Sequence, residues 1–128
     1  MLKSLSNGVE ISVVTRYLPQ QSDAFNYFYL FQYTITIENQ NDFTVQLLYR
    51  FWSVTDSNGE KRNVEGEGVV GETPCLLPGE KFTYNSGCDF HTEMGQMKGR
   101  YRMQRISDGK EFYAEIPLFR MIAPFKLN

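Results

Sequence analysis

The sequence predicts an all-β fold, an antiparallel immunoglobulin-like or fibronectin type III-like β-sandwich of about seven strands. Apolar and polar residues alternate with a period of two in several segments, which is typical of half-buried strands. Turn-forming dipeptides separate these segments, and none has the i, i+3, i+4 apolar spacing of an amphipathic helix. With 128 residues, 41% of them hydrophobic, we expect one domain over residues 1–128 around one core. A small β-barrel is the alternative architecture.

The clearest strand is expected from Phe25 to Ile37, where every second residue is apolar. Phe28 and Leu30 make its first half apolar on the other face as well. We therefore expect a partner or another segment to cover that face. The other expected strands occupy residues 9–14, 45–51, 61–65, 81–86, 96–106 and 110–118, with hairpin turns at Asn58-Gly59 and Asp108-Gly109.

Charge and composition narrow the classes of partner. The net charge of −2 provides no global attraction to nucleic acid or to an anionic membrane. The first residues lack the apolar run of a signal peptide, and no apolar stretch is long enough to span a bilayer. We therefore expect a cytoplasmic protein without nucleic-acid binding or membrane insertion. Cys75 and Cys88 are expected to be free thiols, because a core of this size needs no disulfide.

A glycine-rich segment at residues 66–71 has the pattern GxGxxG. In dinucleotide-binding folds this pattern leads into a helix, but Pro74 and Pro78 exclude a helix here. A backbone nest for an anion remains an alternative, and its members would be Gly66, Gly68, Val69, Val70 and Gly71. Glu67 and Glu72 would repel a polyphosphate unless a divalent cation bridged them. The competing interpretation is a structural loop whose glycines adopt special backbone angles.

Trp52 and Arg50 form the first candidate contact pair. By simple alternation they lie opposite the face formed by Val45, Leu47, Tyr49 and Phe51. That places Trp52 on the outer face beside Arg50, and both residue types are enriched in interface hot spots. The alternative is a β-bulge that turns Trp52 into the core, where sandwiches often keep a tryptophan.

A basic stripe is expected on the strand at residues 96–106. Lys98, Arg100 and Arg102 share one parity, and Met97, Tyr101 and Met103 share the other. Such a stripe would suit phosphates or an acidic protein surface, although charged residues on the solvated face of a strand are also the default.

Metal binding and catalysis have little support in the residues. Cys88, His91 and Glu93 lie close together, but the chain has one histidine and two cysteines in all, fewer than a zinc site at paired spacings requires. His91 stands in no nucleophile motif, and no acid and base pair can be assigned. We therefore expect no enzyme activity, no catalytic residue, no metal and no cofactor.

Several segments resemble the ApaG family over nearly the whole chain. They are residues 33–39, 52–59, 64–74, 77–87, 95–103 and 116–119, and the most specific among them is GVVGE-x-P at residues 68–74. The resemblance implies a fibronectin type III-like sandwich. It also implies an association with diadenosine tetraphosphate hydrolysis, cobalt resistance and magnesium efflux. Similar domains in eukaryotic F-box proteins and in a polymerase-interacting protein bind other proteins.

Two functional hypotheses follow. The first is a cytosolic protein-interaction module that uses the Trp52 and Arg50 face or the strand around Phe28 and Leu30, with another protein or a second copy of the chain as partner. The second is binding of a nucleotide or pyrophosphate, of the diadenosine polyphosphate type, at the loop Gly66 to Gly71. Hydrolysis of such a ligand is the least supported alternative.

Overall fold

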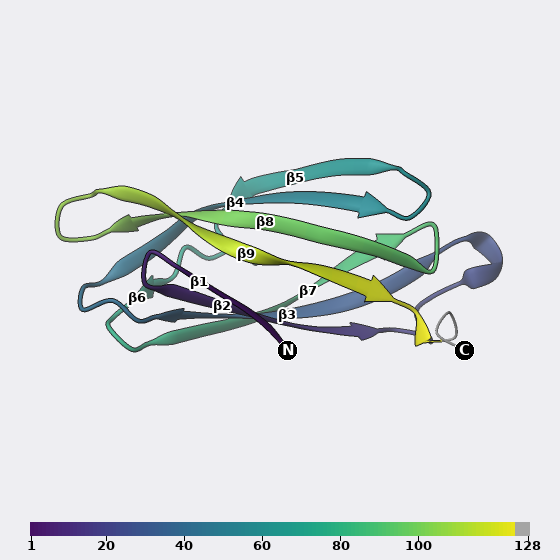
Figure 1. The fold of residues 1–128 in the computed structure, drawn as a ribbon, viewed down its shortest axis with the longest axis horizontal. Coiled ribbons are helices and arrows are strands. Elements are labelled where there is room, and N and C mark those ends of the chain that lie inside the picture. Colours follow the sequence, from purple (N-terminus) through teal and green to yellow (C-terminus); the bar gives the residue numbers. More distant parts are fainter. Residues whose placement is uncertain (125–128) are drawn as a thin grey trace.

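The structure, a computed structural model that describes residues 1–124, consists of two antiparallel sheets packed face to face (Figure 1). The first sheet has the order β1 (Leu2–Ser6), β2 (Val9–Tyr17), β3 (Tyr29–Asn39) and β7 (Lys81–Phe90). The second has the order β5 (Lys61–Glu67), β4 (Val45–Asp56), β8 (Met94–Arg105) and β9 (Glu111–Ile122), and β6 (Cys75–Leu76) also pairs with β4. The predicted antiparallel sandwich is confirmed.

The described residues contain nine strands, where the sequence predicted about seven. The short strand β6 and the N-terminal strand β1 were not predicted. Most residues of β1 are exposed. A strand without a buried face does not need apolar residues at every second position, so it lacks the alternation by which strands are predicted. Its signal lies in the turn that follows, where Asn7 and Gly8 have φ values of 50° and 74°, as a tight hairpin requires.

The start of β3 also differs from the prediction. The alternation suggested a strand from Phe25, but β3 begins at Tyr29. Residues 24–26 form a 3-10 turn instead, and Tyr27 has φ 55°. From Tyr29 onward the alternation is regular, and every second residue of β3 up to Asn39 is buried.

The core lies between the two sheets and is rich in aromatic side chains. Tyr33 of β3, Trp52 of β4 and Phe119 of β9 contact one another, with ring centroids 5.5 to 5.9 Å apart. Such tilted and edge-to-face pairs add to the stabilisation from burial alone. The largest fully buried side chains are Tyr101, Phe31, Phe90, Phe119, Ile11, Ile35, Ile37, Leu47, Met103, Met121, Val9 and Val45.

One side of the sandwich is closed by side chains that reach from the β1 hairpin to β9. Ser4 Oγ donates to the Glu115 carbonyl (2.5 Å), and Ser6 Oγ accepts from the Glu115 N–H (2.8 Å). Asn7 Nδ2 donates to the Tyr113 carbonyl (2.8 Å). The opposite side is bordered by the edge strands β5 and β7. A cleft between the sheets can therefore open there.

Within residues 1–124, no helix is long and apolar enough to cross a membrane. Both cysteines are free thiols, as the sequence predicted, with Cys75 exposed and Cys88 buried.

Candidate functional site

A β-bulge in β4 decides which residues of that strand face the core. Leu47 pairs with Met103 and Tyr49 with Arg102, so Leu48 has no residue opposite it. One extra residue reverses the side-chain parity of the strand from that point on. Val45 and Leu47 are buried before the bulge, and Trp52 is buried after it.

Trp52 is therefore only 4% exposed, and the expectation that it lies on the outer face is wrong. The bulge that we considered as the alternative is confirmed. For the same reason Tyr49 and Phe51, expected in the core, lie half-buried on the outer face. Trp52 cannot serve as a surface anchor in this conformation. Arg50 shares the inward parity of Trp52 and lines a cleft between the sheets with it.

The glycine-rich loop is a tight turn with internal hydrogen bonds. The Gly68 N–H donates to the Leu48 carbonyl (2.9 Å), and the Val69 N–H donates to the Glu72 carbonyl (2.8 Å). Val70 and Gly71 have φ values of 44° and 80°, as a two-residue turn of type I′ requires. Two of the five N–H groups proposed for an anion nest, those of Gly68 and Val69, are thus already bound to carbonyls.

Arg50 holds this loop from the inside. Its Nη1 atom donates to the carbonyls of Glu67 and Gly68, both at 3.0 Å. A Cβ atom added at Gly66 would lie 2.9 to 3.1 Å from the guanidinium atoms. Gly66 therefore makes room for Arg50, and the loop carbonyls orient the guanidinium. This contact explains part of the glycine pattern without any bound ligand.

The segment that precedes β3 forms an ordered turn that presents two aromatic side chains. We call residues 22–28 the aromatic turn; Figure 1 shows it at one end of the sandwich, between β2 and β3. Phe25 is 91% exposed and Tyr27 is 69% exposed. Sequence reasoning assigned both to a buried strand face, which is wrong.

Hydrogen bonds around Asp23 fix the aromatic turn. The Asp23 carboxylate accepts from the Asn26 N–H (3.3 Å) and from Asn26 Nδ2 (2.6 Å). The Asp23 and Phe28 backbones exchange two hydrogen bonds of 2.8 and 2.9 Å. Ser22 Oγ donates to the Leu18 carbonyl and accepts from the Leu30 N–H. The spacing of Asp23 and Asn26 is a signal in the sequence that could have indicated this turn, because Asx side chains satisfy local backbone groups.

Phe28 and Leu30, the second predicted contact pair, are half-buried; Phe28 is the last residue of the aromatic turn and Leu30 is the second residue of β3. The exposed aromatic residues of this segment are instead Phe25 and Tyr27, which sequence reasoning did not identify as exposed.

The basic stripe lies on the outer face of the second sheet, as predicted. Arg100 stacks over the ring of Tyr113, with its Cζ atom 4.1 Å from the ring centroid, and also contacts Phe51 at 5.5 Å. Arg102 lies over Tyr49. Lys98 and Arg100 line a hollow of about 490 Å³, but Glu65 and Glu115 line it too. Carboxylates therefore lie beside the basic residues, and this surface is not uniformly positive.

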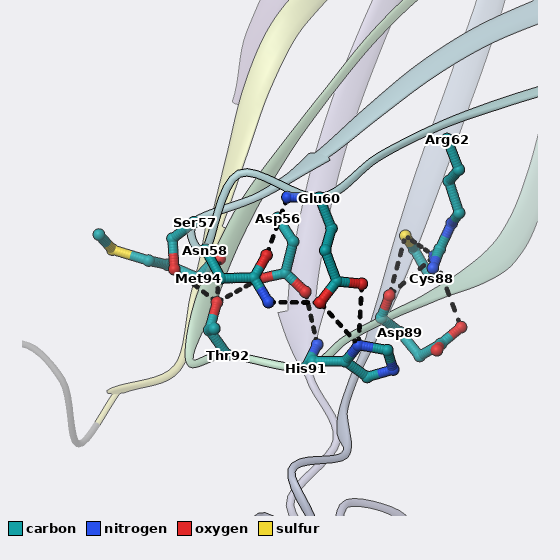
Figure 2. Close-up of polar contacts among 10 residues, drawn as sticks. All are labelled: Asp56, Ser57, Asn58, Glu60, Arg62, Cys88, Asp89, His91, Thr92 and Met94. Atoms are coloured by element: carbon teal, nitrogen blue, oxygen red, sulfur yellow. Dashed lines mark hydrogen bonds and ion pairs between the residues drawn. The ribbon is translucent and has the colours of Figure 1, made fainter.

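A polar cluster joins the β4–β5 and β7–β8 turns (Figure 2). The buried Asp56 carboxylate accepts from the His91 N–H (2.6 Å) and from the Thr92 hydroxyl. The His91 ring lies 3.2 Å from Glu60. Such charge-assisted bonds join the two turns firmly.

Cys88, His91 and Glu93 do not come together as a set of metal ligands. Cys88 contacts Arg62 rather than His91, with a distance of 3.2 Å from Nη2 to Sγ. Within the described part of the chain no group of three His, Cys, Asp or Glu side chains has the geometry to hold a metal ion. Figure 2 shows Cys88 with Arg62 on one side of the cluster and His91 with Glu60 on the other.

The fold and these surfaces define the class of protein as an all-β sandwich domain. The sequence profile of the ApaG domain matches residues 19–105. Protein ApaG of Pseudomonas aeruginosa is 47% identical over 127 residues, 99% of this chain and 100% of that protein. Protein ApaG of Beijerinckia indica subsp. indica is 44% identical over 125 residues, 98% of this chain and 95% of that protein. The chain belongs to the ApaG domain family.

Solved structures agree with this assignment. A crystal structure of a Bordetella pertussis protein named ApaA superposes with a TM-score of 0.88 at 39% identity, covering 91% of this chain and 94% of that one. The C-terminal domain of wzt superposes with a TM-score of 0.56 at 5% identity, covering 95% of this chain and 77% of that one. The second likeness concerns the fold alone.

Proposed function

We propose that this chain is a binding module, not an enzyme, and that it recognises a protein partner through the aromatic turn. The observation that carries the proposal is the 91% exposure of Phe25 on a turn that internal hydrogen bonds hold in place. Aromatic side chains dominate the binding energy of protein interfaces. Because the turn is already ordered, a partner would lose less conformational entropy on binding it than on binding a mobile loop.

The energetics favour a covered rather than a solvated Phe25. Burying a phenylalanine side chain stabilises by about 1.5–3 kcal/mol relative to leaving it in water. Tyr27 lies two residues away, with φ 55°, a left-handed conformation that costs roughly 1–2 kcal/mol for a residue with a side chain. Exposed aromatic area and local strain in one ordered turn are typical of a recognition site.

The proposal places the module in the cytosol, as the sequence suggests. The link of the family to cobalt resistance and magnesium efflux would then act through the partner. Binding of a nucleotide or pyrophosphate at the Gly66 to Gly71 loop remains a separate hypothesis, and the engaged N–H groups of Gly68 and Val69 weaken it.

The test compares the wild-type chain with the double variant Phe25→Ser, Tyr27→Ser. Val14→Ser is the matched control, because Val14 is an exposed apolar residue of β2 outside the turn. Each of the three proteins is used to pull down partners from the cytosol of cells that naturally contain this chain. A captured partner is then purified and titrated with each of the three proteins by calorimetry. We expect the double variant to weaken binding at least tenfold, roughly the effect of losing one hot-spot residue. The control should bind like the wild type.

Two results would contradict this proposal. One is an identical set of partners, with equal affinity, for the wild type and the double variant. The other is that the chain sediments with lipid vesicles only when Phe25 is present, and that binding to every captured protein is independent of Phe25. The turn would then contact a membrane and not a protein.

A further inference from the structure

A cleft of about 170 Å³ lies between the edge strands β5 and β7. The side chains of Arg50 and Arg62 reach it from the second sheet, and those of Tyr33 and Ser86 reach it from the first. Trp52 also lines it, so one wall is apolar. Guanidinium and hydroxyl groups that converge beside an apolar wall are typical of a small-ligand site.

Small residues on both edge strands keep this cleft open. Gly66 pairs with Arg50 across β4 and β5, and it has no side chain to occupy the space that the guanidinium takes. Ser86 pairs with Tyr33 across β3 and β7. Val64, which is 41% exposed, lines the cleft from β5, where it pairs with Trp52 of β4.

The residues that line this cleft carry two positive charges and no negative charge. Arg62 reaches Asp89 at 3.5 Å, but both side chains are more than 40% exposed, and such a surface pair is weak. Within the described residues Arg50 has no carboxylate within 4.0 Å. A half-buried guanidinium without a counterion attracts an anion more strongly than one in open solvent, because the apolar wall lowers the local dielectric.

The orientation of Arg50 leaves donors available. Both bonds to the loop carbonyls come from Nη1. Among the contacts of residues 1–124, none engages Nη2 or Nε of this side chain. A guanidinium presents its donors as a planar fork that matches two oxygens of a phosphate or carboxylate.

We propose that this cleft binds a tetrahedral oxyanion, the phosphate group of a small phosphorylated compound, between Arg50 and Arg62, with one hydroxyl of the Tyr33 and Ser86 pair as a further donor. The glycine-rich loop orients Arg50 by its carbonyls and does not bind the anion by its N–H groups. This site is independent of the aromatic turn and of any protein partner.

The test is a titration of the full chain with inorganic phosphate, sulfate and acetate at constant ionic strength. The Nε–H signals of Arg50 and Arg62 and the indole N–H signal of Trp52 are followed by NMR. Val64→Glu places a carboxylate in the cleft without removing either arginine. Val14→Glu makes the same change of charge on an exposed residue of β2, outside the cleft. Arg62→Gln is a second variant that leaves the loop contacts of Arg50 in place.

We expect phosphate and sulfate to shift all three signals with saturation at millimolar concentration. Val64→Glu and Arg62→Gln should each weaken the affinity at least tenfold, about the effect of one charge-assisted hydrogen bond. Val14→Glu should leave it unchanged. Chemical shifts that change linearly with phosphate concentration, without saturation, would overturn the proposal. So would an equal affinity for phosphate in Val64→Glu and Val14→Glu. Acetate binding as tight as phosphate binding would also overturn it.

Discussion

The phenol oxygens of Tyr84 and Tyr101 lie 2.5 Å apart and share a hydrogen bond between the two sheets. Tyr84 belongs to β7 and Tyr101 to β8, and both side chains are buried. Burial raises the pKa of both phenols, because the charged form loses its hydration. Both hydroxyls therefore stay neutral, and one of them donates to the other.

Removing both hydroxyls of this pair should cost less than the sum of the costs of removing each alone. Tyr101→Phe or Tyr84→Phe leaves a buried hydroxyl without this partner, which we expect to lower the free energy of unfolding by about 1–3 kcal/mol. The double variant should lose less than the sum of the two single losses, since it leaves no orphaned group. Urea unfolding of the wild type, the two single variants and the double variant measures this double-mutant cycle. Additive losses would show that the hydroxyls do not stabilise each other.

The burial of Trp52 should be visible in solution. It is the only tryptophan of the chain, so intrinsic fluorescence reports on it alone. We expect slow quenching by acrylamide in the native protein and fast quenching in urea. Trp52→Ala should lower the free energy of unfolding by about 3–5 kcal/mol, as large-to-small core changes do. Phe51→Ala, on the outer face of the same strand, is the matched control and should cost less. Native quenching as fast as in urea would contradict the bulge in β4.

Two glycines of the loop should respond differently to alanine. A Cβ atom at Gly68 would lie 2.2 Å from the Glu72 carbonyl oxygen, whereas one at Gly71 would meet nothing within 4 Å. Both have positive φ, so Gly71→Ala should cost about 1–2 kcal/mol from backbone strain alone. Gly68→Ala should cost more, since the backbone must also move. Equal midpoints of thermal unfolding for Gly68→Ala and Gly71→Ala would contradict the close approach of Gly68 to the Glu72 carbonyl.

Alkaline pH should destabilise the fold through Cys88. Burial raises the pKa of its thiol from the ordinary 9.0 to about 11, against a smaller lowering by Arg62. The folded state therefore holds a proton that the unfolded state releases between these values. Stability is fully present below pH 9 and falls as the pH rises toward 11, by up to about 2–3 kcal/mol.

Unfolding in urea across this pH range tests the effect, with Cys88→Ala and Cys75→Ser compared. Cys88→Ala should reduce the pH dependence and Cys75→Ser should not, because Cys75 is exposed. Iodoacetamide at mildly alkaline pH should modify Cys75 in the native protein and spare Cys88. Rapid labelling of both native thiols would show that Cys88 is accessible.

The strand pattern was predictable where one face of a strand is buried throughout. In β3 the buried residues from Tyr29 to Asn39 follow the alternation of the sequence. The outward parity of Lys98, Arg100 and Arg102 was predictable for the same reason, although Arg102 is half-buried. Local backbone and side-chain sterics set this period of two, so it can be read without knowing the partner strand.

The aromatic turn and the arginine cleft were not predictable in this way. Phe25 and Tyr27 continue the alternation of β3 in sequence, yet Asp23 diverts the chain into a turn before the strand starts. Arg50 and Arg62 come from two strands joined by a hairpin, and Ser86 and Tyr33 come from the other sheet. Only the packing of the two sheets brings these groups together.

The sequence alone determined the class of fold, the tight turns and the family, because these depend on local periodicity, on backbone angles and on ordered runs of residues. Tertiary structure decided which face of β4 became the core. The unpaired Leu48 in the ladder with β8 turns Trp52 inward and aims Arg50 between the sheets. A bulge depends on the register with a neighbouring strand, and that register is a property of the folded sheet rather than of any one segment.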